Sequence, residues 1–293
     1  ERNAPGSIEI MTRAFAGGGP YNDRRIIFTA MASIMALCAG GGAAFLRGSR
    51  SQAIYSPEDM PYPMQIPFLG YVPTVRSSKA VNGQAAPAMI ESVRVVRTAL
   101  LSRLNGRKGA VILITSAVAG TGKSHLSMML GESLARSGKK VLLIDADLRR
   151  MTLTRQLDLC EKSGFIQSLT RGVVSKRYIF KTEDKAGLEF MPAGKATENG
   201  QVFEQTAGGD FRACIEQLRG QYDIILLDSP PVLPAADATI MSNQVDGTIM
   251  VERQLISRRD DEVDAFVRLT TGGGHLIGTV FVGSGGHGTY TYN

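Results

Sequence analysis

Cysteine and histidine are scarce in this sequence, and neither residue type is clustered. The three cysteines lie far apart and form no C-x-x-C pair, at Cys38, Cys160 and Cys214. This spacing excludes a disulfide framework and a cysteine zinc site, and it favours a reducing compartment for the core. The three histidines are equally scattered, at His125, His275 and His287. A histidine metal triad is therefore excluded.

The sequence also lacks a basic surface interleaved with aromatic residues. It carries 33 Lys and Arg against 27 Asp and Glu, a net charge of +6, but these side chains are scattered and aromatic residues make up only 6%. Proteins that bind single-stranded nucleic acid stack bases on aromatic side chains within a basic groove. We therefore expect no nucleic-acid partner, and we assign the basic balance to attraction toward anionic membrane lipid.

Charge is absent from one long stretch, residues 26–46. A helix over this stretch would be ~30 Å long, the thickness of the hydrocarbon core of a bilayer. The alternatives are a buried core helix and a signal peptide, and the second is disfavoured because no small-residue cleavage site follows. We expect a transmembrane helix over 24–47. Arginines flank both of its ends and leave the orientation open, but a nucleotide site would place residues 47–293 in the cytoplasm.

What the sequence does contain is a phosphate-binding loop, residues 116–124, between an apolar run (110–115) and a helical pattern (126–136). This is the P-loop order of strand, Gly-Lys-Ser loop and helix, with alanine in place of the usual first glycine. A plain glycine turn is the alternative, and the complete string disfavours it. The backbone N–H groups of this loop and the dipole of the following helix would bind phosphates. The hydroxyl of Ser124 would bind Mg²⁺. ATP and Mg²⁺ are therefore the expected cofactors. The predicted nucleotide-binding residues are Ala117, Val118, Ala119, Gly120, Thr121, Gly122, Lys123 and Ser124.

Beyond residue 110, apolar runs alternate with helical patterns. Strands are predicted at 110–115, 141–145, 188–191, 223–228, 247–251 and 276–282. Helices are predicted at 88–104, 123–137, 162–170, 210–219, 236–243 and 260–270. Continuous apolar strands separated by helices indicate the α/β class: a P-loop, doubly wound, mostly parallel sheet with helices on both faces. Ligands of such sheets bind at the carboxyl ends of the strands.

Carboxylates end two of the predicted strands. The second strand ends at Asp145 and Asp147, and the fourth ends at Asp228. Mg²⁺ takes one or two carboxylates and keeps several waters, so Asp228 would hold it directly or through water. Asp145 and Asp147 would hold the metal or accept the proton of an attacking hydroxyl. N-capping of the following helix is the alternative reading of these aspartates, and Arg149 would face phosphate or pair with an acid.

Helix 88–104 places charged residues beside an apolar stripe. The stripe comprises Ile90, Val93, Leu100, Leu101 and Leu104. Arg94 lies at its edge, Arg97 lies inside it and Glu91 lies beyond it. An arginine in an apolar arc needs a carboxylate or an exit to water. Two interpretations stay open: snorkelling at the surface, and a subunit interface in which Glu91 of one copy faces the arginines of the next.

Two further stretches flank the predicted domain. Residues 51–87 are rich in proline and predict a semi-rigid linker. Within it, residues 67–73 either dock on another part of the protein or remain plain linker. Residues 284–293 are rich in glycine and contain Tyr290 and Tyr292. They are either a frayed tail or a substrate, in which a tyrosine enters the nucleotide site of a neighbour.

With these motifs identified, the chain resembles the bacterial tyrosine kinases that are fused to polysaccharide co-polymerases of the chain-length-determinant type. Residues 91–97 look like the E-x2-R-x2-R interface motif of that family, 116–124 like its Walker A, 144–149 like its Walker A′ and 227–231 like its Walker B. Residues 69–73 look like its juxtamembrane segment. The ordered set of motifs is specific and covers nearly the whole chain.

The resemblance implies ATP-dependent tyrosine autophosphorylation in trans within a ring of subunits, which regulates exopolysaccharide or capsule polymerisation and export. The catalytic residues would be Lys123, Asp145, Asp147 and Asp228, with Asp145 as the base. The metal would be held by Ser124, Asp145 and Asp228. The phosphoacceptors would be Tyr290 and Tyr292. The oligomer interface would comprise Glu91, Arg94 and Arg97.

The same resemblance divides the chain and locates it. Its parts would be the end of an extracytoplasmic chain-length-determinant domain (1–23), a transmembrane helix (24–47), a juxtamembrane linker (48–87), a cytoplasmic kinase domain (88–283) and a tyrosine-containing tail (284–293). The expected location is the cell inner membrane. The expected partners are further copies of the chain in a ring, the polysaccharide polymerase and export machinery, a tyrosine phosphatase and the membrane.

Two other functions compete with the kinase. A ParA/MinD-like ATPase switch shares this fold, but such proteins usually carry a second lysine early in the P-loop, where this chain has residues 117–119, Ala-Val-Ala. A co-polymerase whose kinase half has decayed is the other alternative. The intact Lys123, Asp145 and Asp228 argue against it. The tail also departs from the family, with two tyrosines where a longer cluster is usual.

Overall fold

The computed structural model of the 293-residue chain describes residues 24–49, 52–60, 66–74, 87–182, 187–195 and 209–284. It contains two compact units, Glu1–Ser51 and Gln52–Asn293. The expected end of an extracytoplasmic domain (1–23) and the tail tyrosines Tyr290 and Tyr292 lie outside the described residues.

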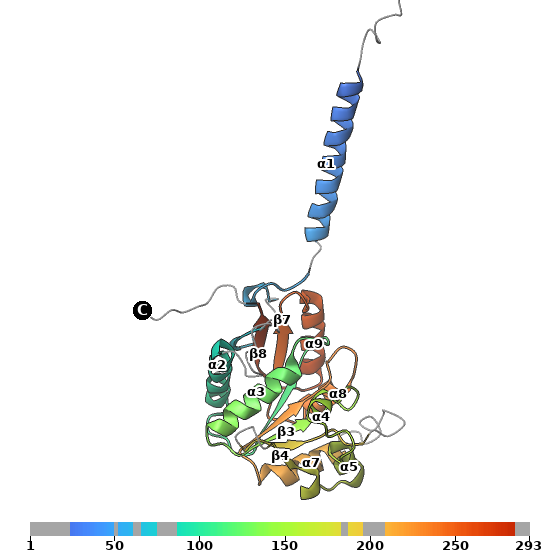
Figure 1. The fold of residues 1–293 in the computed structure, drawn as a ribbon. Coiled ribbons are helices and arrows are strands. Elements are labelled where there is room, and N and C mark those ends of the chain that lie inside the picture. The colour runs from blue at the N-terminus through green and yellow to red at the C-terminus, as the bar shows by residue number, and fades with distance from the viewer. Residues whose placement is uncertain are drawn as a thin grey trace, which may run out of the picture. The chain divides into compact units, whose positions relative to one another are not determined.

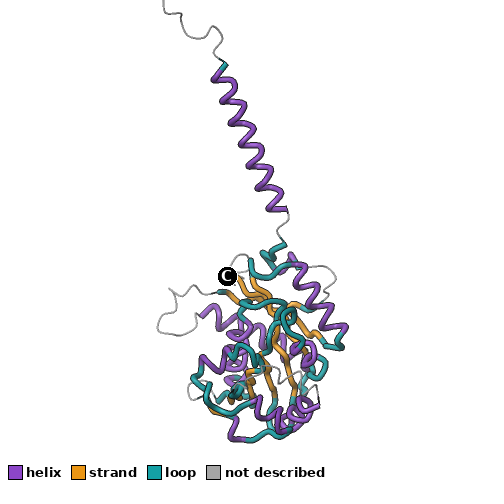
Figure 2. The backbone as a smooth tube through the Cα atoms, turned by 90° about the vertical axis from the view of Figure 1, so that its right-hand side faces the viewer, coloured by secondary structure: helices purple, strands orange, loops and turns teal. Residues whose placement is uncertain are grey.

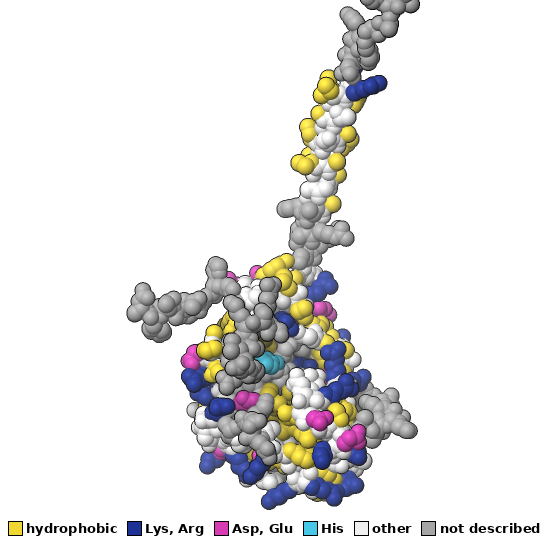
Figure 3. Space-filling model, in the orientation of Figure 1, with side chains coloured by type: hydrophobic (Ala, Val, Ile, Leu, Met, Phe, Trp, Pro, Cys, Tyr) yellow, Lys and Arg dark blue, Asp and Glu magenta, His cyan; other side chains and the backbone are white. Residues whose placement is uncertain are grey.

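The first unit contains helix α1 (Arg25–Ser49). Its segment Arg25–Ala43 has a mean hydropathy of 1.8 and no buried residue, and it is long and apolar enough to cross a membrane by length and composition. Figure 3 shows apolar side chains along it. The hydroxyl of Thr29 donates to the carbonyl of Arg25 at 2.9 Å, and the hydroxyl of Ser33 donates to that of Thr29 at 2.8 Å. These bonds satisfy both hydroxyls within the helix.

The second unit is built on an eight-stranded sheet in the order β1-β8-β7-β2-β6-β3-β5-β4 (Figure 1). Neighbouring strands are parallel except for β4 and β5, which are antiparallel. The strands are β1 (Phe68–Pro73), β2 (Ala110–Thr115), β3 (Val141–Asp145), β4 (Phe180–Lys181), β5 (Glu189–Met191), β6 (Ile224–Asp228), β7 (Gly247–Arg253) and β8 (Leu276–Gly283). The predicted α/β class with a mostly parallel sheet is confirmed.

Helices cover both faces of this sheet (Figures 1 and 2). They are α2 (Pro87–Leu104), α3 (Lys123–Arg136), α4 (Thr152–Gln156), α5 (Phe165–Arg171), α7 (Gly209–Arg219), α8 (Asp237–Ser242) and α9 (Arg259–Thr271), with short 3-10 turns η1 (Pro57–Asp59) and η4 (Lys176–Tyr178). Strand β2 shows why both faces are apolar. Its Ile112 and Ile114 pack in one buried cluster with α2 and α3, whereas Val111 and Leu113 pack in another with α5 and α7.

The sequence predicted most of these elements. All six predicted strands form, with ends displaced by at most two residues. The helix predicted at 162–170 begins later, at Phe165, because the N–H groups of Phe165 and Ile166 bond the carbonyls of Pro192 and Ala193 at 2.8 Å. Strands β1 and β4 and helix α4 were not predicted as regular elements. The last two have two and five residues, too few for a periodic pattern.

The buried stripe of α2 differs from the prediction. Val93 and Leu100 are buried as expected, but Ile90 is 43% exposed. Met89 and Val96 complete the buried face instead. Their spacing of four, three and four residues is the seam of a helix that packs on a neighbour, and α2 contacts both β1 and α3.

Residues 67–73 dock on the sheet and are not plain linker. They contain β1, which pairs with β8 at the sheet edge, and the N–H of Thr279 donates to the carbonyl of Pro67 at 2.9 Å. Leu69 is 3% exposed, and Gly278 allows its close approach, since a Cβ there would lie 2.3 Å from its side chain. The compact unit thus includes this segment in addition to the domain expected to begin at residue 88.

Candidate functional site

The P-loop lies at the centre of the sheet, between β2 and α3. Gly120 and Gly122 have φ of +85° and +95°, in the left-handed region that glycine adopts without strain. A Cβ at Gly120 would meet nothing within 4 Å, so the backbone conformation and not lack of space requires glycine there. Helix α3 begins at Lys123, directly after this turn. Its N-terminus is therefore available to an anion at the carboxyl end of β2.

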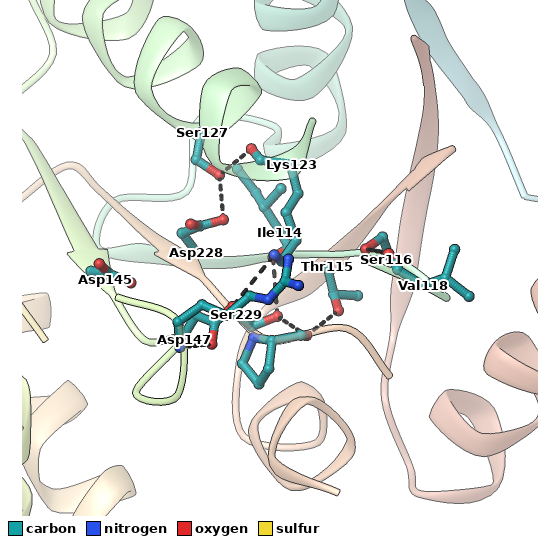
Figure 4. Close-up of polar contacts among 12 residues, drawn as sticks. Ile114, Thr115, Ser116, Val118, Lys123, Ser127, Asp145, Asp147, Asp228 and Ser229 are labelled. Carbon is teal, nitrogen blue, oxygen red and sulfur yellow. Dashed lines mark hydrogen bonds and ion pairs between the residues drawn. The ribbon is translucent and has the colours of Figure 1, made fainter. Parts of the chain in front are cut away.

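Lys123 turns its side chain into the site, where it is 7% exposed (Figure 4). Its Nζ lies 3.5 Å from Oδ2 of Asp147, which compensates a charge that would be costly to bury alone. Ser127, one turn along α3, lies with its hydroxyl 3.2 Å from Oδ1 of Asp228. Asp147, which follows β3, and Asp228, which ends β6, thus both lie beside the start of α3.

Asp145 and Asp228 are direct neighbours in the register of β3 and β6, and both are fully buried. Oδ2 of Asp145 accepts hydrogen bonds from the N–H and the hydroxyl of Thr154, each at 2.8 Å. The hydroxyl oxygen of Thr154 in turn accepts the N–H of Ala193 at 2.8 Å. Asp145 is therefore fixed through the first turn of α4, although the N-cap residue of that helix is Met151.

Burial shifts the acidity of both carboxyls. It raises the pKa of Asp145 to about 6, against the lowering effect of the Thr154 hydrogen bonds. It raises the pKa of Asp228 to about 7, partly offset by the positive charge of Lys123 and raised further by Asp145. A second cation near these two groups would favour their ionised forms.

The residues fit a nucleotide with Mg²⁺. Oδ1 of Asp145, Oδ2 of Asp228 and the hydroxyl of Thr121 are buried and lack a hydrogen-bond partner within the described part of the chain. The described part of the chain contains no group of three or more His, Cys, Asp or Glu residues that could hold a metal alone. Mg²⁺ uses few protein carboxylates and completes its shell with phosphate and water, so this donor set matches it.

Two flanking residues, Asp147 and Arg149, have defined partners within the chain. The two carboxylate oxygens of Asp147 have different partners. Oδ1 accepts the N–H of Arg150 at 3.0 Å, and Oδ2 faces the Nζ of Lys123. Arg149 pairs with an acid: its Nε lies 3.4 Å from Oδ2 of Asp237, at the start of α8. Asp147 is thus both a turn-capping residue and a partner of the lysine.

Three residues of this site were missed from the sequence: Ser127, Thr154 and Arg253. Arg253 ends β7, and its guanidinium donates to the carbonyl of Gly120 at 2.8 Å. Ser127 and Arg253 contact residues 101 and 133 positions away, and Thr154 contacts Asp145 nine positions before it, so no local motif marks them. The pairing of β2 with β6 and β7 brings Ser127 and Arg253 to their partners.

The predicted interface motif lies on α2, away from the P-loop. Glu91 and Arg94 form an ion pair of 2.9 Å within the chain, with both side chains largely exposed. Arg97 leaves the apolar stripe by donating to the carbonyl and hydroxyl of Ser133 on α3 at 2.9 and 3.2 Å. The three residues line an open hollow of about 510 Å³. Within one copy of the chain, Arg97 uses a carbonyl and not a carboxylate.

Comparison with known proteins gives one family and several relatives. The AAA domain family matches residues 109–257. A putative tyrosine-protein kinase EpsB of Ralstonia nicotianae is 27% identical over 263 residues, which cover 85% of this chain. The chain spans 35% of the length of that relative.

Solved structures match the second compact unit. The BceF tyrosine kinase domain is 31% identical, with a TM-score of 0.69 over 80% of this chain and all of that one. The kinase domain of Escherichia coli tyrosine kinase ETK has the same fold, with a TM-score of 0.70 at 24% identity over 82% of this chain and 99% of that one. The septum site-determining protein MinD of Pyrococcus horikoshii, complexed with Mg-ADP, is 25% identical with a TM-score of 0.50, over 59% of this chain and 69% of that one.

Proposed function

Since the chain belongs to the AAA domain family, and within it to the bacterial tyrosine kinases, we propose that it transfers the γ-phosphoryl group of ATP to tyrosines of a second copy of itself. One observation carries the proposal. The buried Lys123 lies beneath the P-loop with Asp147, and Asp145 and Asp228 present carboxylate oxygens without partners within the described residues. This arrangement suits phosphoryl transfer, which depends on positioning and charge stabilisation.

The chain's residues divide the reaction among them. Lys123 binds the β- and γ-phosphates, and the N–H groups of residues 117–122 surround them. Ser124, Asp228 and Asp145 would hold Mg²⁺, which would neutralise charge on the phosphates when bound. The tyrosine oxygen bonds to the γ-phosphorus while the bond between that phosphorus and the β,γ-bridging oxygen breaks and ADP leaves. Asp145 accepts the proton of the tyrosine hydroxyl in this step. Burial raises the pKa of this carboxyl above its usual value, which strengthens it as a base.

Transfer in trans requires that copies of the chain meet. Glu91, Arg94 and Arg97 would make the interface, with the first two exchanging their ion pair within one chain for pairs between copies. In a closed ring each copy places its tail beside its neighbour. Tyr290 and Tyr292 would accept the phosphoryl group, since tethering raises their effective concentration at the adjacent site. The added charge would weaken the ring through repulsion.

Helix α1 and the relatives support a setting at the membrane. Helix α1 would anchor the chain in the inner membrane with the sheet domain in the cytoplasm, where ATP is present. The relative EpsB bears the name of a putative tyrosine-protein kinase. A ring beneath the membrane would regulate exopolysaccharide polymerisation and export together with the polymerase, and a tyrosine phosphatase would reset it.

The test uses the full chain in detergent with ATP and Mg²⁺, measuring phosphotyrosine and released ADP together. We expect phosphotyrosine in the wild type and none in Lys123→Met. Steady ADP release without phosphotyrosine would instead support the MinD-like ATPase switch. Failure to bind ATP at millimolar concentration would support a decayed kinase half.

A further inference from the structure

Thr154 joins three segments of the chain at the carboxyl end of the sheet. It lies in α4, and its side chain is fully buried. Its hydroxyl oxygen lies 2.8 Å from Oδ2 of Asp145, the last residue of β3, and 2.8 Å from the backbone nitrogen of Ala193. Strands β3 and β5 are parallel, with Ile144 opposite Met191, so the segment after β5 runs alongside the end of β3. The threonine thus connects the strand that carries Asp145 with its neighbour in the sheet.

The direction of the Thr154 hydroxyl is fixed by its two partners. A hydroxyl has one hydrogen to donate and two lone pairs with which to accept. The backbone N–H of Ala193 can only donate, so the oxygen of Thr154 accepts it. The carboxylate of Asp145 can only accept, so the single hydrogen of the hydroxyl is donated to Oδ2. Burial of all three residues shields these bonds from bulk water and strengthens them.

The two oxygens of Asp145 are thereby made unequal. Oδ2 accepts the N–H of Thr154 as well as its hydroxyl, each at 2.8 Å. Oδ1 is buried and has no hydrogen-bond partner within the residues that the structure describes. The last torsion of an aspartate side chain is broad, and two bonds to one oxygen narrow it, so the other oxygen keeps one position. Oδ1 is therefore the oxygen left for a reacting group.

Asp228, the neighbour of Asp145 in the register of β6 and β3, is held differently (Figure 4). The hydroxyl of Ser127 lies 3.2 Å from Oδ1 of Asp228, but it also donates to the carbonyl of Lys123 at 2.9 Å. One hydrogen cannot make both bonds at full strength, and the carbonyl is the nearer acceptor. Ser127 is therefore not a dedicated donor to Asp228, whereas Thr154 is one to Asp145.

We propose that Thr154 is a positioning residue for phosphoryl transfer: its hydroxyl, oriented by Ala193, holds Oδ2 of Asp145 and leaves Oδ1 to accept the proton of the acceptor tyrosine. The O–H bond of the tyrosine breaks and an O–H bond forms at Oδ1. The electron pair of the broken bond stays on the tyrosine oxygen, which attacks the γ-phosphorus. The inference rests on the proposed function, since it takes Asp145 as the base. It adds a residue outside the P-loop and identifies the oxygen that reacts.

The first experiment compares variants of Thr154 in the full chain in detergent. It measures phosphotyrosine formation at saturating ATP and Mg²⁺, the KM for ATP, and the binding of a fluorescent ADP. Thr154→Val keeps nearly the same shape without the hydroxyl, and its saturated rate should fall about tenfold, the effect of one hydrogen bond to a charged group. KM and ADP affinity should change less than about twofold, since the contact is to the base and not to the nucleotide.

Two further variants complete this series. Thr154→Ser keeps the donor and should recover most of the saturated rate. Thr182→Val is the matched control, because it also removes a threonine hydroxyl bond, to the carbonyl of Leu188 at 2.6 Å. This bond lies at the amino end of β5, which begins at Glu189, so the rate, KM and ADP affinity should all stay unchanged.

Melting temperatures separate positioning from a loss of packing. Thr154→Val leaves the N–H of Ala193 without its acceptor and Thr154→Ser removes a buried methyl group, so both should lower the melting temperature, but only the first should slow transfer. Equal falls in the rates of the two variants would overturn the positioning role. A changed KM or ADP affinity with an unchanged saturated rate would overturn it as well. If Thr154→Val does not fold, Thr154→Ala takes its place with the same expected rate.

The second experiment places Thr154→Val in the Asp145→Asn background. If Thr154 acts only through Asp145, the double variant should be at most about twofold slower than Asp145→Asn alone, whereas independent effects multiply. A further tenfold fall would show that Thr154 does not act through Asp145. A wild-type chain that forms no phosphotyrosine would refute the kinase and this inference with it. An active wild type with an equally active Thr154→Val would refute the inference alone.

Discussion

Two pairs of buried carboxylates lie in this domain, and they differ in what surrounds them. Asp145 and Asp228 end adjacent central strands beside Lys123, and Thr154 fixes the first of them. Glu252 on β7 and Glu262 on α9 are equally buried, but within the described residues they have no cationic partner. Burial raises the pKa of Glu262 to about 7 and, with the charge of Glu262, holds the pKa of Glu252 well above its usual range.

The difference shows that burial and a raised pKa do not by themselves mark a reaction site. The aspartates combine these properties with a lysine, a glycine-rich anion loop and oxygens left open to a ligand. The glutamates lie on a strand and on the helix packed against it, and the raised pKa of Glu252 avoids two adjacent buried charges. We therefore expect substitutions in the first pair to affect catalysis, and substitutions in the second to affect the pH dependence of folding.

The largest expected effect is that of Lys123→Met. It removes the cation that binds the transferring phosphoryl group, and phosphotransfer should fall roughly a thousandfold or more. Initial rates of phosphotyrosine formation measure it. Lys139→Met, at an exposed position before β3, is the matched control and should leave the rate unchanged. A rate within tenfold of wild type in Lys123→Met would remove the lysine from the reaction.

The next effect concerns the aspartates themselves. Asp145→Asn and Asp228→Asn both keep the side-chain shape and an acceptor oxygen but lose the negative charge, and Asp145→Asn also loses the base. Each should lower the transfer rate about a hundredfold. The melting temperature should show that both variants fold. Asp158→Asn, at an exposed turn with φ of +54° that asparagine tolerates, provides the control. Near-normal rates in Asp145→Asn would contradict its role as base.

The glutamate pair should instead control stability. The unfolded chain ionises Glu262 near pH 4.5, whereas the folded protein keeps its proton up to about pH 7. Stability from this group is therefore complete below pH 4.5 and is lost as the pH rises through 7. From pH 5 to pH 8 the wild type should lose about 2.5 kcal/mol of unfolding free energy through this group, so Glu262→Gln should gain about that amount relative to wild type.

Unfolding at both pH values measures this gain, with saturating Mg-ADP present so that Asp145 and Asp228 stay ionised. Kinase activity of the variant should stay within a factor of two or so of wild type, since Glu262 lies on α9, outside the P-loop, Lys123 and the two aspartates. Equal pH dependence in the variant and the wild type would show that Glu262 is not the titrating group. Loss of kinase activity in Glu262→Gln would contradict the view that the aspartate pair serves catalysis and the glutamate pair only stability.

The smallest effect is expected at Arg149. Its pair with Asp237 is long and the arginine is 46% exposed, so Arg149→Ala should change stability by less than about 1 kcal/mol. The transfer rate should change only a few-fold. A hundredfold fall with unchanged stability would assign Arg149 to phosphate, the alternative that the sequence left open.

Local patterns made the centre of the fold predictable from the sequence. Apolar runs identified the six strands, and the P-loop string placed Lys123 at the start of a helix. Strand β1 escaped because its pattern, Phe-Leu-Gly-Tyr-Val-Pro, is short and lies among prolines, and the residues of its partner β8 are 210 positions later. Edge strands tolerate such proline, so composition alone could not separate it from linker.

The site was predicted less completely for the same reason. Lys123, Asp145, Asp147 and Asp228 sit in recognisable motifs, and the structure brings all four together. Thr154 and Arg253 act through contacts that only the folded sheet creates. The apolar stripe of α2 was predicted with Ile90 in place of Met89 and Val96, because strand β1, against which α2 packs, was not predicted.

Transfer between copies is the central claim, and one mixing experiment tests it most directly. A Lys123→Met chain with its tail intact is mixed in detergent with a chain that keeps Lys123 but carries Tyr290→Phe and Tyr292→Phe. After addition of ATP and Mg²⁺, the phosphorylated residues of each chain are mapped by mass spectrometry. We predict phosphate on Tyr290 or Tyr292 of the Lys123→Met chain. Absence of phosphate from that tail, while the wild-type chain alone becomes phosphorylated there, would contradict transfer in trans.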